Sequence, residues 1–157
     1  MSAYSDGLNM LARRELSVAE VRARLVDREH PADEIDAAIA RLIETGALDD
    51  TRVARAYART AKTVKGRGRL RVQQELQAMG IAREIIAEAI AETFADADER
   101  ALIDQAIQKK LRNAGAARRK LSLQERARLY QHLMRQGFTP AGISAALRRI
   151  GAARDLD

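Results

Sequence analysis

One pattern of apolar residues recurs three times along this chain of 157 residues. Each copy has two aliphatic residues four positions apart, a connection, and then a second pair with the same spacing. This spacing places both members of a pair on one face of a helix, as in helices that bury that face. Shifts of 51 and then 57 residues relate the three copies, which are Val21, Leu25, Ile35 and Ile39, then Val72, Leu76, Ile86 and Ile90, then Leu129, Leu133, Ile143 and Leu147. The recurrence predicts an array of similar helical units.

Residues that begin and end helices flank these positions. Ser17 with Glu20, and Ser122 with Glu125, are capping boxes, in which the serine and the acid satisfy free N–H groups of a first helical turn. Glycine after the last turn permits the left-handed conformation that closes a helix, and we expect it to do so at Gly46, Gly80 and Gly137. No segment shows the sustained two-residue alternation of strands, so we predict no sheet.

A further helix is expected before each pair, at residues 3–14, 51–62 and 98–113. The chain is therefore predicted to be all-α, with three tandem three-helix repeats in an elongated or curved arrangement. We assign the first repeat to residues 1–50, the second to 51–97 and the third to 98–157. Because repeated units need no symmetric partner to cover their cores, we expect a monomer.

Charge is distributed unevenly over these repeats. The first repeat has six Lys and Arg against eleven Asp and Glu, a net charge of −5. The second has nine against five, a net charge of +4, and the third has thirteen against six, a net charge of +7. The positive charge of the last two repeats favours association with polyanions or with an acidic protein surface, and indicates nothing about the fold.

Two groups of basic residues are candidates for contact with such a partner. The second-repeat cations follow one face of the expected helix 51–62 and continue into a glycine-containing connection: Arg52, Arg55, Arg59, Lys62, Lys65, Arg67, Arg69 and Arg71. The third-repeat cations occupy the equivalent part of the next repeat: Lys109, Lys110, Arg112, Arg118, Arg119, Lys120, Arg126, Arg128 and Arg135. Such side chains neutralise phosphates with little sequence preference. Runs of charge also occur as plain solvated surface, and this alternative remains open.

A catalytic centre is hard to assemble from these residues. The chain has no cysteine, which excludes thiol nucleophiles, disulfides and thiolate zinc sites. His30 is expected to cap a helix, and His132 lies beside apolar positions; neither has a nucleophile or a second ligand at a useful spacing. Asp49 and Asp50 are explained more simply as helix caps than as a carboxylate pair. We predict no enzyme, no cofactor and no metal site.

No membrane association is expected. No window approaches the roughly 18 apolar residues of a membrane span, and the first residues lack the pattern of a secretory signal. The absence of cysteine is consistent with a reducing compartment. We predict a cytoplasmic protein.

Four stretches of sequence together have the pattern of one known family. They are residues 11–17 (LARRELS) with Glu20 and Leu25; 42–50 (LIETGALDD) with Ala54 and Tyr57; Gly68 with Glu75, Leu76, Gly80 and Ile81; and 130–138 (YQHLMRQGF). Together they resemble the bacterial regulatory proteins of the RecX family, and the resemblance extends from residue 11 to residue 150. Members of that family are helical proteins with three repeats.

The resemblance implies a function that composition and spacing do not show. The partner is then the RecA recombinase in its filament form, and binding inhibits recombination and ATP hydrolysis, which modulates DNA repair and the SOS response. The basic repeats add weak, non-specific affinity for DNA. Two alternatives remain open: a sequence-independent nucleic-acid-binding helical module without a RecA target, and a repeat scaffold for an unrelated acidic protein.

Overall fold

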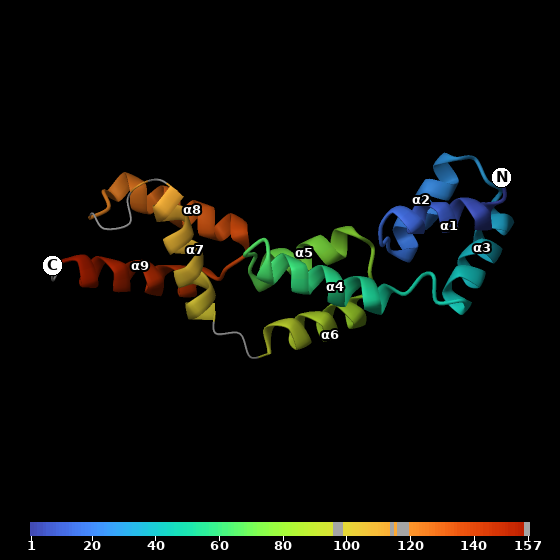
Figure 1. Cartoon of the computed structure of the whole chain (residues 1–157). Coiled ribbons are helices and arrows are strands. Elements are labelled where there is room, and N and C mark those ends of the chain that lie inside the picture. The colour runs from blue at the N-terminus through green and yellow to red at the C-terminus, as the bar shows by residue number, and fades with distance from the viewer. Residues whose placement is uncertain (96–98, 114, 116–119, 156–157) are drawn as a thin grey trace. The chain divides into compact units, whose positions relative to one another are not determined.

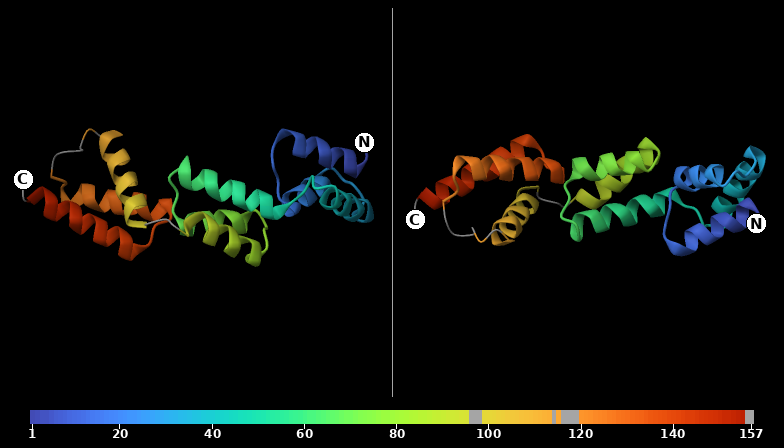
Figure 2. Two further views of the ribbon diagram at one scale, coloured as in Figure 1. Left: turned by 60° about the horizontal axis from the view of Figure 1, so that its bottom comes forward. Right: turned by 90° about the horizontal axis from the view of Figure 1, so that it is seen from above.

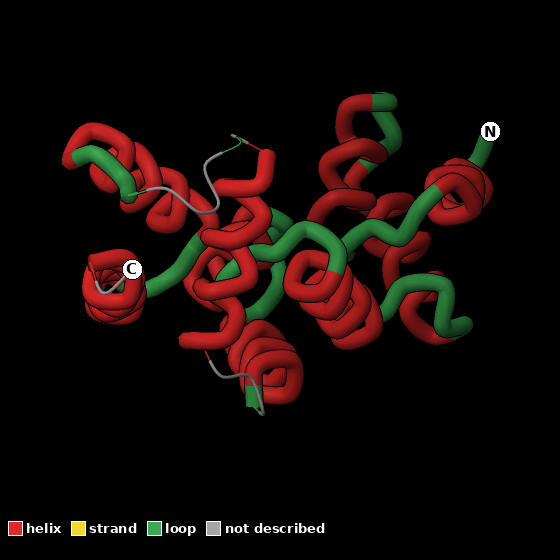
Figure 3. Tube along the Cα trace, turned by 60° about the vertical axis from the view of Figure 1, so that its left-hand side comes forward, coloured by secondary structure: helices red, strands yellow, loops and turns green. Residues whose placement is uncertain are grey.

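The computed structural model describes residues 1–95, 99–113, 115 and 120–155, with side chains up to residue 151. Over these residues the chain consists of helices and their connections, without a strand (Figures 1 and 3). This part of the chain has nine helices: α1 (Ala3–Arg13), α2 (Val18–Asp27), α3 (Ala32–Glu44), α4 (Asp50–Thr63), α5 (Arg69–Ala78), α6 (Arg83–Phe94), α7 (Glu99–Asn113), α8 (Leu123–Gln136) and α9 (Pro140–Asp155). The prediction of an all-α chain made of three successive three-helix repeats is confirmed.

The helices begin where the capping residues indicate. The Ser17 hydroxyl accepts a hydrogen bond from Glu20 N at 3.1 Å, and Ser17 N donates to Glu20 Oε1 at 2.9 Å. Ser122 and Glu125 form the same reciprocal pair at the start of α8. Each pair satisfies two N–H groups that a free helix end leaves without a partner. Both predicted capping boxes are therefore present.

The first repeat has a core of its own. Helices α1, α2 and α3 pack on one another, and their buried residues come only from residues 3–48. The core consists of Ala3, Met10, Leu16, Val21, Leu25, Ile35, Ala38, Ile39, Leu42 and Leu48. Each large aliphatic side chain buried in this way stabilises the fold by about 1.5–3 kcal/mol.

The third repeat is built in the same way from α7, α8 and α9, which pack pairwise (Figure 2). Its core consists of Ile103, Ile107, Leu111, Leu121, Leu129, Leu133, Phe138, Ile143, Ala146 and Leu147. In the second repeat Val72, Leu76, Ile86 and Ile90 are buried. All twelve apolar positions that define the sequence repeat are therefore buried.

The chain forms two compact units, residues 1–58 with 74–91 and residues 59–73 with 92–157. Within the first unit, the N-terminus of α2 meets the turn that follows α5. The Ser17 hydroxyl donates to Met79 O at 2.5 Å, and Asp50 Oδ1 accepts from Val18 N at 2.9 Å. We call this contact between the first two repeats the first joint.

Within the second unit, the N-terminus of α5 meets the turn that follows α8. Gly68 N donates to Gln136 O at 2.7 Å, and Leu70 N donates to Gly137 O at 3.1 Å. A Cβ atom on Gly68 would lie 2.6 Å from Gly137 O, so only glycine permits this approach. We call this contact the second joint. It joins the elements equivalent to those of the first joint, one repeat further along the chain.

Candidate functional site: the cations of the second and third repeats

Arg52, at the start of α4, holds the fold together. Its guanidinium donates to Gly46 O at 2.9 Å and to Ala47 O at 3.2 Å, and it pairs with Glu15 at 3.3 Å. A cation at this position satisfies carbonyl groups beyond the end of α3. Asp49 Oδ1 accepts from Arg52 N at 3.1 Å, as predicted for a helix cap. The aspartates at 49 and 50 thus both cap helices, since Asp50 accepts from Val18 N at the start of α2.

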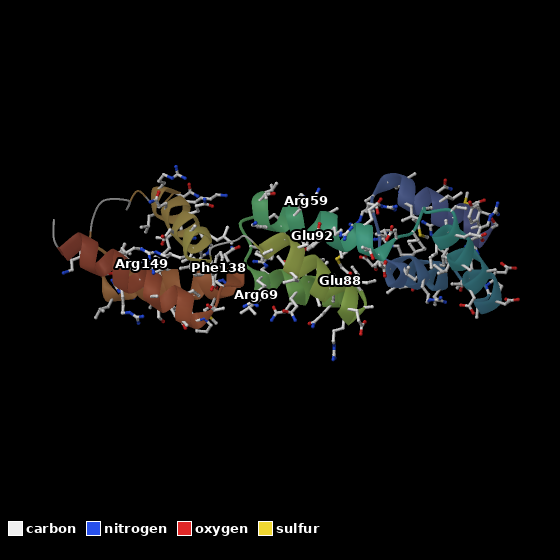
Figure 4. The ribbon with its side chains drawn as sticks, turned by 90° about the horizontal axis from the view of Figure 1, so that it is seen from below. Arg59, Arg69, Glu88, Glu92, Phe138 and Arg149 are labelled. Carbon is white, nitrogen blue, oxygen red and sulfur yellow. The ribbon has the colours of Figure 1, made fainter. Side chains whose placement is uncertain are left out.

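Further along α4, the cations divide by exposure. Arg55 and Arg59 are exposed, and the Arg59 guanidinium has no partner among the described residues (Figure 4). Lys62 is half-buried, donates to Thr93 O at 2.9 Å, and lies 5.7 Å from the centroid of the Phe94 ring. That distance is within the range of a cation–π contact. Lys62 therefore ties the end of α4 to the end of α6.

The connection to α5 presents two exposed cations, Lys65 and Arg69. Arg67 and Arg71 are half-buried, and the Arg71 guanidinium donates to Arg135 O at 3.1 Å. A cation placed on the last carbonyl groups of α8 is favoured by the dipole of that helix. The second joint therefore brings the start of α5 to the end of α8, 64 residues further along the chain.

The third-repeat cations are mostly exposed. Exposed members are Lys109, Lys110, Arg112, Lys120, Arg128 and Arg135. Arg126 is half-buried, and its guanidinium donates to Leu147 O at 3.0 Å. Arg118 and Arg119 lie outside the described residues. Contact of either group of cations with a partner remains a prediction.

A charged cluster around the buried carboxylate of Asp6, in the first repeat, was not foreseen. The Asp6 carboxylate is paired with the Arg28 guanidinium and lies 2.7 Å from His30 Nε2. The hydrogen bond from His30 and the charge of Arg28 lower the pKa of Asp6 against the opposing effect of burial. His30 was expected to cap a helix, but α3 has Pro31 at its N-cap and no side-chain cap. The sequence separation of Asp6 from its two partners leaves no local signal for the cluster.

His132 also has surroundings that its sequence position does not reveal. The side chain is half-buried and makes no hydrogen bond with the described residues. Burial, followed by the charges of Lys110 and Arg135, lowers the pKa of His132. The imidazole is therefore mainly neutral near neutral pH.

Metal-binding groups and membrane spans are both absent from the described part of the chain. Its residues contain no group of three or more His, Cys, Asp or Glu side chains arranged to hold a metal ion. None of its helices combines the length and apolar character needed to cross a membrane.

Comparison with known proteins identifies the family. A family profile described as the second three-helix domain of RecX matches residues 49–90, and one described as the first three-helix domain matches residues 3–42. The regulatory protein RecX of Pelodictyon phaeoclathratiforme is 33% identical over 147 residues, which cover 93% of this chain and 87% of that protein. The chain belongs to the RecX family.

Other RecX proteins extend the comparison. The regulatory protein RecX of Geobacillus kaustophilus is 37% identical over 92% of this chain, but the chain spans only about half of that protein, 52% of its length. The crystal structure of RecX from Lactobacillus salivarius has a TM-score of 0.73 and 20% identity, and the match covers 99% of this chain and 96% of that one. A second crystal structure of RecX has a TM-score of 0.74 at 19% identity. At these identities the two structures support the RecX fold alone.

Proposed function

We propose that this chain is a regulator that binds filaments of the RecA recombinase and inhibits their ATPase activity and recombination. The observation that carries the proposal is the match to a regulatory protein over 93% of this chain and 87% of that relative. The proposal assigns binding rather than catalysis to the chain. It acts as a monomer in the cytoplasm, where it modulates DNA recombination and repair.

The repeated architecture suits a repeated partner. Three successive repeats, at residues 1–50, 51–97 and 98–157, contact several protomers of a filament at once, and linked weak contacts reinforce one another. The second-repeat and third-repeat cations supply the surface for the filament and a weak, sequence-independent affinity for its DNA. Exposed cations without a described partner, such as Arg59 and Arg69, are the strongest candidates.

The test is the ATPase activity of RecA on single-stranded DNA during titration with the full chain. We expect the rate to fall and the filaments seen by electron microscopy to shorten as the protein approaches the RecA concentration. An unchanged rate together with an unchanged length distribution at equimolar protein contradicts the proposal. Both readouts are needed because a protein that only competes for DNA slows the ATPase when DNA is limiting. The assay is therefore run with DNA in excess.

A second candidate is a nucleic-acid-binding module without a RecA target. The observation that favours it is the net charge of +4 and +7 on the last two repeats against −5 on the first. It predicts DNA binding in the absence of RecA, with an affinity that falls as salt rises, and no effect on RecA when DNA is in excess. Reversal of the two exposed cations Lys65 and Arg69 to Glu then weakens DNA binding. Unchanged binding by that variant argues against this candidate.

A further inference from the structure

Three side chains of α8 form a stripe along one side of the helix. Arg128, His132 and Arg135 follow i, i+4 and i+7 spacing, which places them on a single helical face. Arg128 and Arg135 are exposed, and His132 between them is half-buried. Seven helical residues rise about 10 Å. A stripe of that length passes about three phosphates of one strand, which follow each other every 3.4 Å or so along a duplex axis.

Helix α7 brings a fourth side chain to this stripe. Lys110 immediately precedes Leu111, and His132 immediately precedes Leu133, and both leucines belong to the core of the third repeat. Helices α7 and α8 pack on each other, and each of the two residues is next in sequence to a core leucine of that packing. The charges of Lys110 and Arg135 both act on the imidazole of His132.

The acids of the third repeat do not neutralise this group. Among the side chains described between residues 99 and 151, the carboxylates are those of Glu99, Asp104 and Glu125. Glu99 accepts from Thr139, Asp104 pairs with Arg149 at 3.3 Å, and Glu125 accepts from Ser122 N. No ion pair reaches Lys110, Arg128 or Arg135 from a described residue. The stripe is therefore a concentration of positive charge without a counter-ion among the described side chains.

The charged groups on the other elements packed around α8 do not oppose this sign. On α9, Arg149 is compensated by Asp104. From the start of α5, the Arg71 guanidinium reaches the end of α8, where it donates to Arg135 O. The two charged groups that act on His132, Lys110 and Arg135, are both cations. An anion bound here relieves the repulsion between them and also favours the charged form of the imidazole.

We propose that Lys110, Arg128, His132 and Arg135 form a binding site for the phosphates of a nucleic-acid backbone, in which His132 binds as the imidazolium. The inference rests on the proposed function and deepens it, since it names one part of the basic surface that contacts DNA. In the free protein the imidazole is neutral near pH 7, so binding takes up one proton from solvent. Proton uptake makes the affinity for DNA rise as the pH falls. Each unit by which bound phosphate raises the pKa of His132 gives a tenfold gain in affinity across the titration.

Fluorescence anisotropy with a labelled duplex oligonucleotide tests the proposal on the full chain. Affinity is measured between about pH 8 and about pH 5.5, where histidine is the side chain that ordinarily titrates, at constant ionic strength and without RecA. We expect the wild-type protein to bind about tenfold more tightly at the lower pH. The affinity of His132→Gln for the oligonucleotide is expected to change little over this pH range.

The chain offers a matched control because it contains two histidines. His30 lies in the first repeat and contacts Asp6, so His30→Gln is expected to keep the wild-type pH dependence. A wild-type affinity that does not change with pH, or a His132→Gln variant that keeps the wild-type change, overturns the proposal. Neither result affects the RecA ATPase test, which is run separately near pH 8 and fails only if RecA is not inhibited.

A second measurement covers the case in which His132→Gln does not fold. The imidazole resonances of the wild-type protein are titrated by NMR with and without the oligonucleotide. We expect the pKa of His132 to rise when DNA is present. A pKa of His132 that does not respond to DNA overturns the proposal.

Discussion

Asp6 is the most deeply buried acid of the first repeat, and the turn between α2 and α3 is arranged around it. The turn directs Arg28 and His30 toward α1, where both reach the Asp6 carboxylate. A buried carboxylate is tolerated only when its charge is paired and its oxygens accept hydrogen bonds. The cluster therefore fastens the first helix of the repeat to the turn between the other two.

Replacing Asp6 with Asn is expected to destabilise the protein by about 1–3 kcal/mol, because the buried amide loses the charge-assisted hydrogen bonds that the carboxylate accepts from Arg28 and His30. Urea unfolding followed by circular dichroism measures the change. Asp36→Asn is the matched control, since Asp36 pairs with Arg22 at 2.6 Å but both side chains are exposed. Such a pair contributes about 1 kcal/mol or less. Equal losses in the two variants contradict a special role for the buried cluster.

The same carboxylate predicts a dependence of stability on pH. The pKa of Asp6 is lowered in the folded protein by its hydrogen bond from His30 and by the charge of Arg28. A lowered pKa stabilises the folded state fully above the unfolded value of about 3.9, and this contribution is lost as the pH falls through the folded pKa. We expect the wild-type protein to lose more stability than Asp6→Asn between about pH 5 and about pH 2. Thermal melts across this range measure it, and parallel curves for the two proteins refute it.

The turns that follow α2, α5 and α8 occupy equivalent positions in the three repeats. Glu29, Gly80 and Gly137 are related by the shifts of 51 and 57 residues, and all three have positive φ, at 64°, 75° and 100°. The N–H groups of the next residues close equivalent bonds, His30 N to Leu25 O, Ile81 N to Leu76 O, and Phe138 N to Leu133 O. Since Glu29 adopts this conformation, positive φ alone does not require glycine at the equivalent positions 80 and 137.

Contact with the preceding repeat explains the two glycines. A Cβ atom at position 80 would lie 2.5 Å from Ala19 Cβ, and one at position 137 would collide with Arg71. The Glu29 side chain is exposed, so the equivalent turn of the first repeat has room for it. Glycine at this position therefore marks a turn that forms a joint.

The first joint can be tested with a pair of glycines that share a backbone conformation. Gly80→Ala introduces a Cβ both at positive φ and against Ala19, whereas Gly46→Ala does so at a φ of 80° with nothing within 4 Å. Left-handed alanine costs roughly 1–2 kcal/mol in either variant. We expect Gly80→Ala to lose about 1–3 kcal/mol more, the usual cost of overpacking. Thermal or urea unfolding measures both variants, and equal losses contradict the role of the joint.

The sequence predicts the helices and the repeat because both depend on local spacing. Capping boxes at Ser17 and Ser122 and the twelve aligned apolar positions involve residues within a few turns of one another, and all of them appear in the structure. Contacts between distant segments leave no such signal. Arg71 reads as one more cation in a basic run, although its guanidinium satisfies a carbonyl 64 residues away. The exposure of each cation in a charged run depends on tertiary packing. The sequence therefore indicates the basic segments, but it does not indicate which of their cations bond to the fold.

Over the whole molecule, the three repeats share a three-helix construction but differ in net charge. The cations of the first repeat are partly used against acids of the same repeat, as in Arg28 with Asp6 and Arg22 with Asp36. In the third repeat the carboxylates are fewer, and those described cap helices or pair with Arg149. Some exposed cations of the later repeats, such as Arg59 and Arg128, therefore have no carboxylate partner among the described residues. Attraction of a polyanion should depend on where a charge lies and not only on the total.

A charge-matched pair of double variants tests this dependence on position. Arg59→Glu with Arg69→Glu reverses two exposed cations of the second repeat, and Arg13→Glu with Arg24→Glu reverses two exposed cations of the first. None of these four side chains has a described partner, and each variant lowers the net charge by the same amount. If each second-repeat arginine contacts one phosphate of a duplex, the slope of log K against log salt becomes shallower by roughly 2. We expect the second-repeat variant to lose DNA affinity and RecA inhibition, while the first-repeat variant keeps both. Anisotropy titrations over a series of salt concentrations give the two slopes, and equal losses show that net charge alone governs binding.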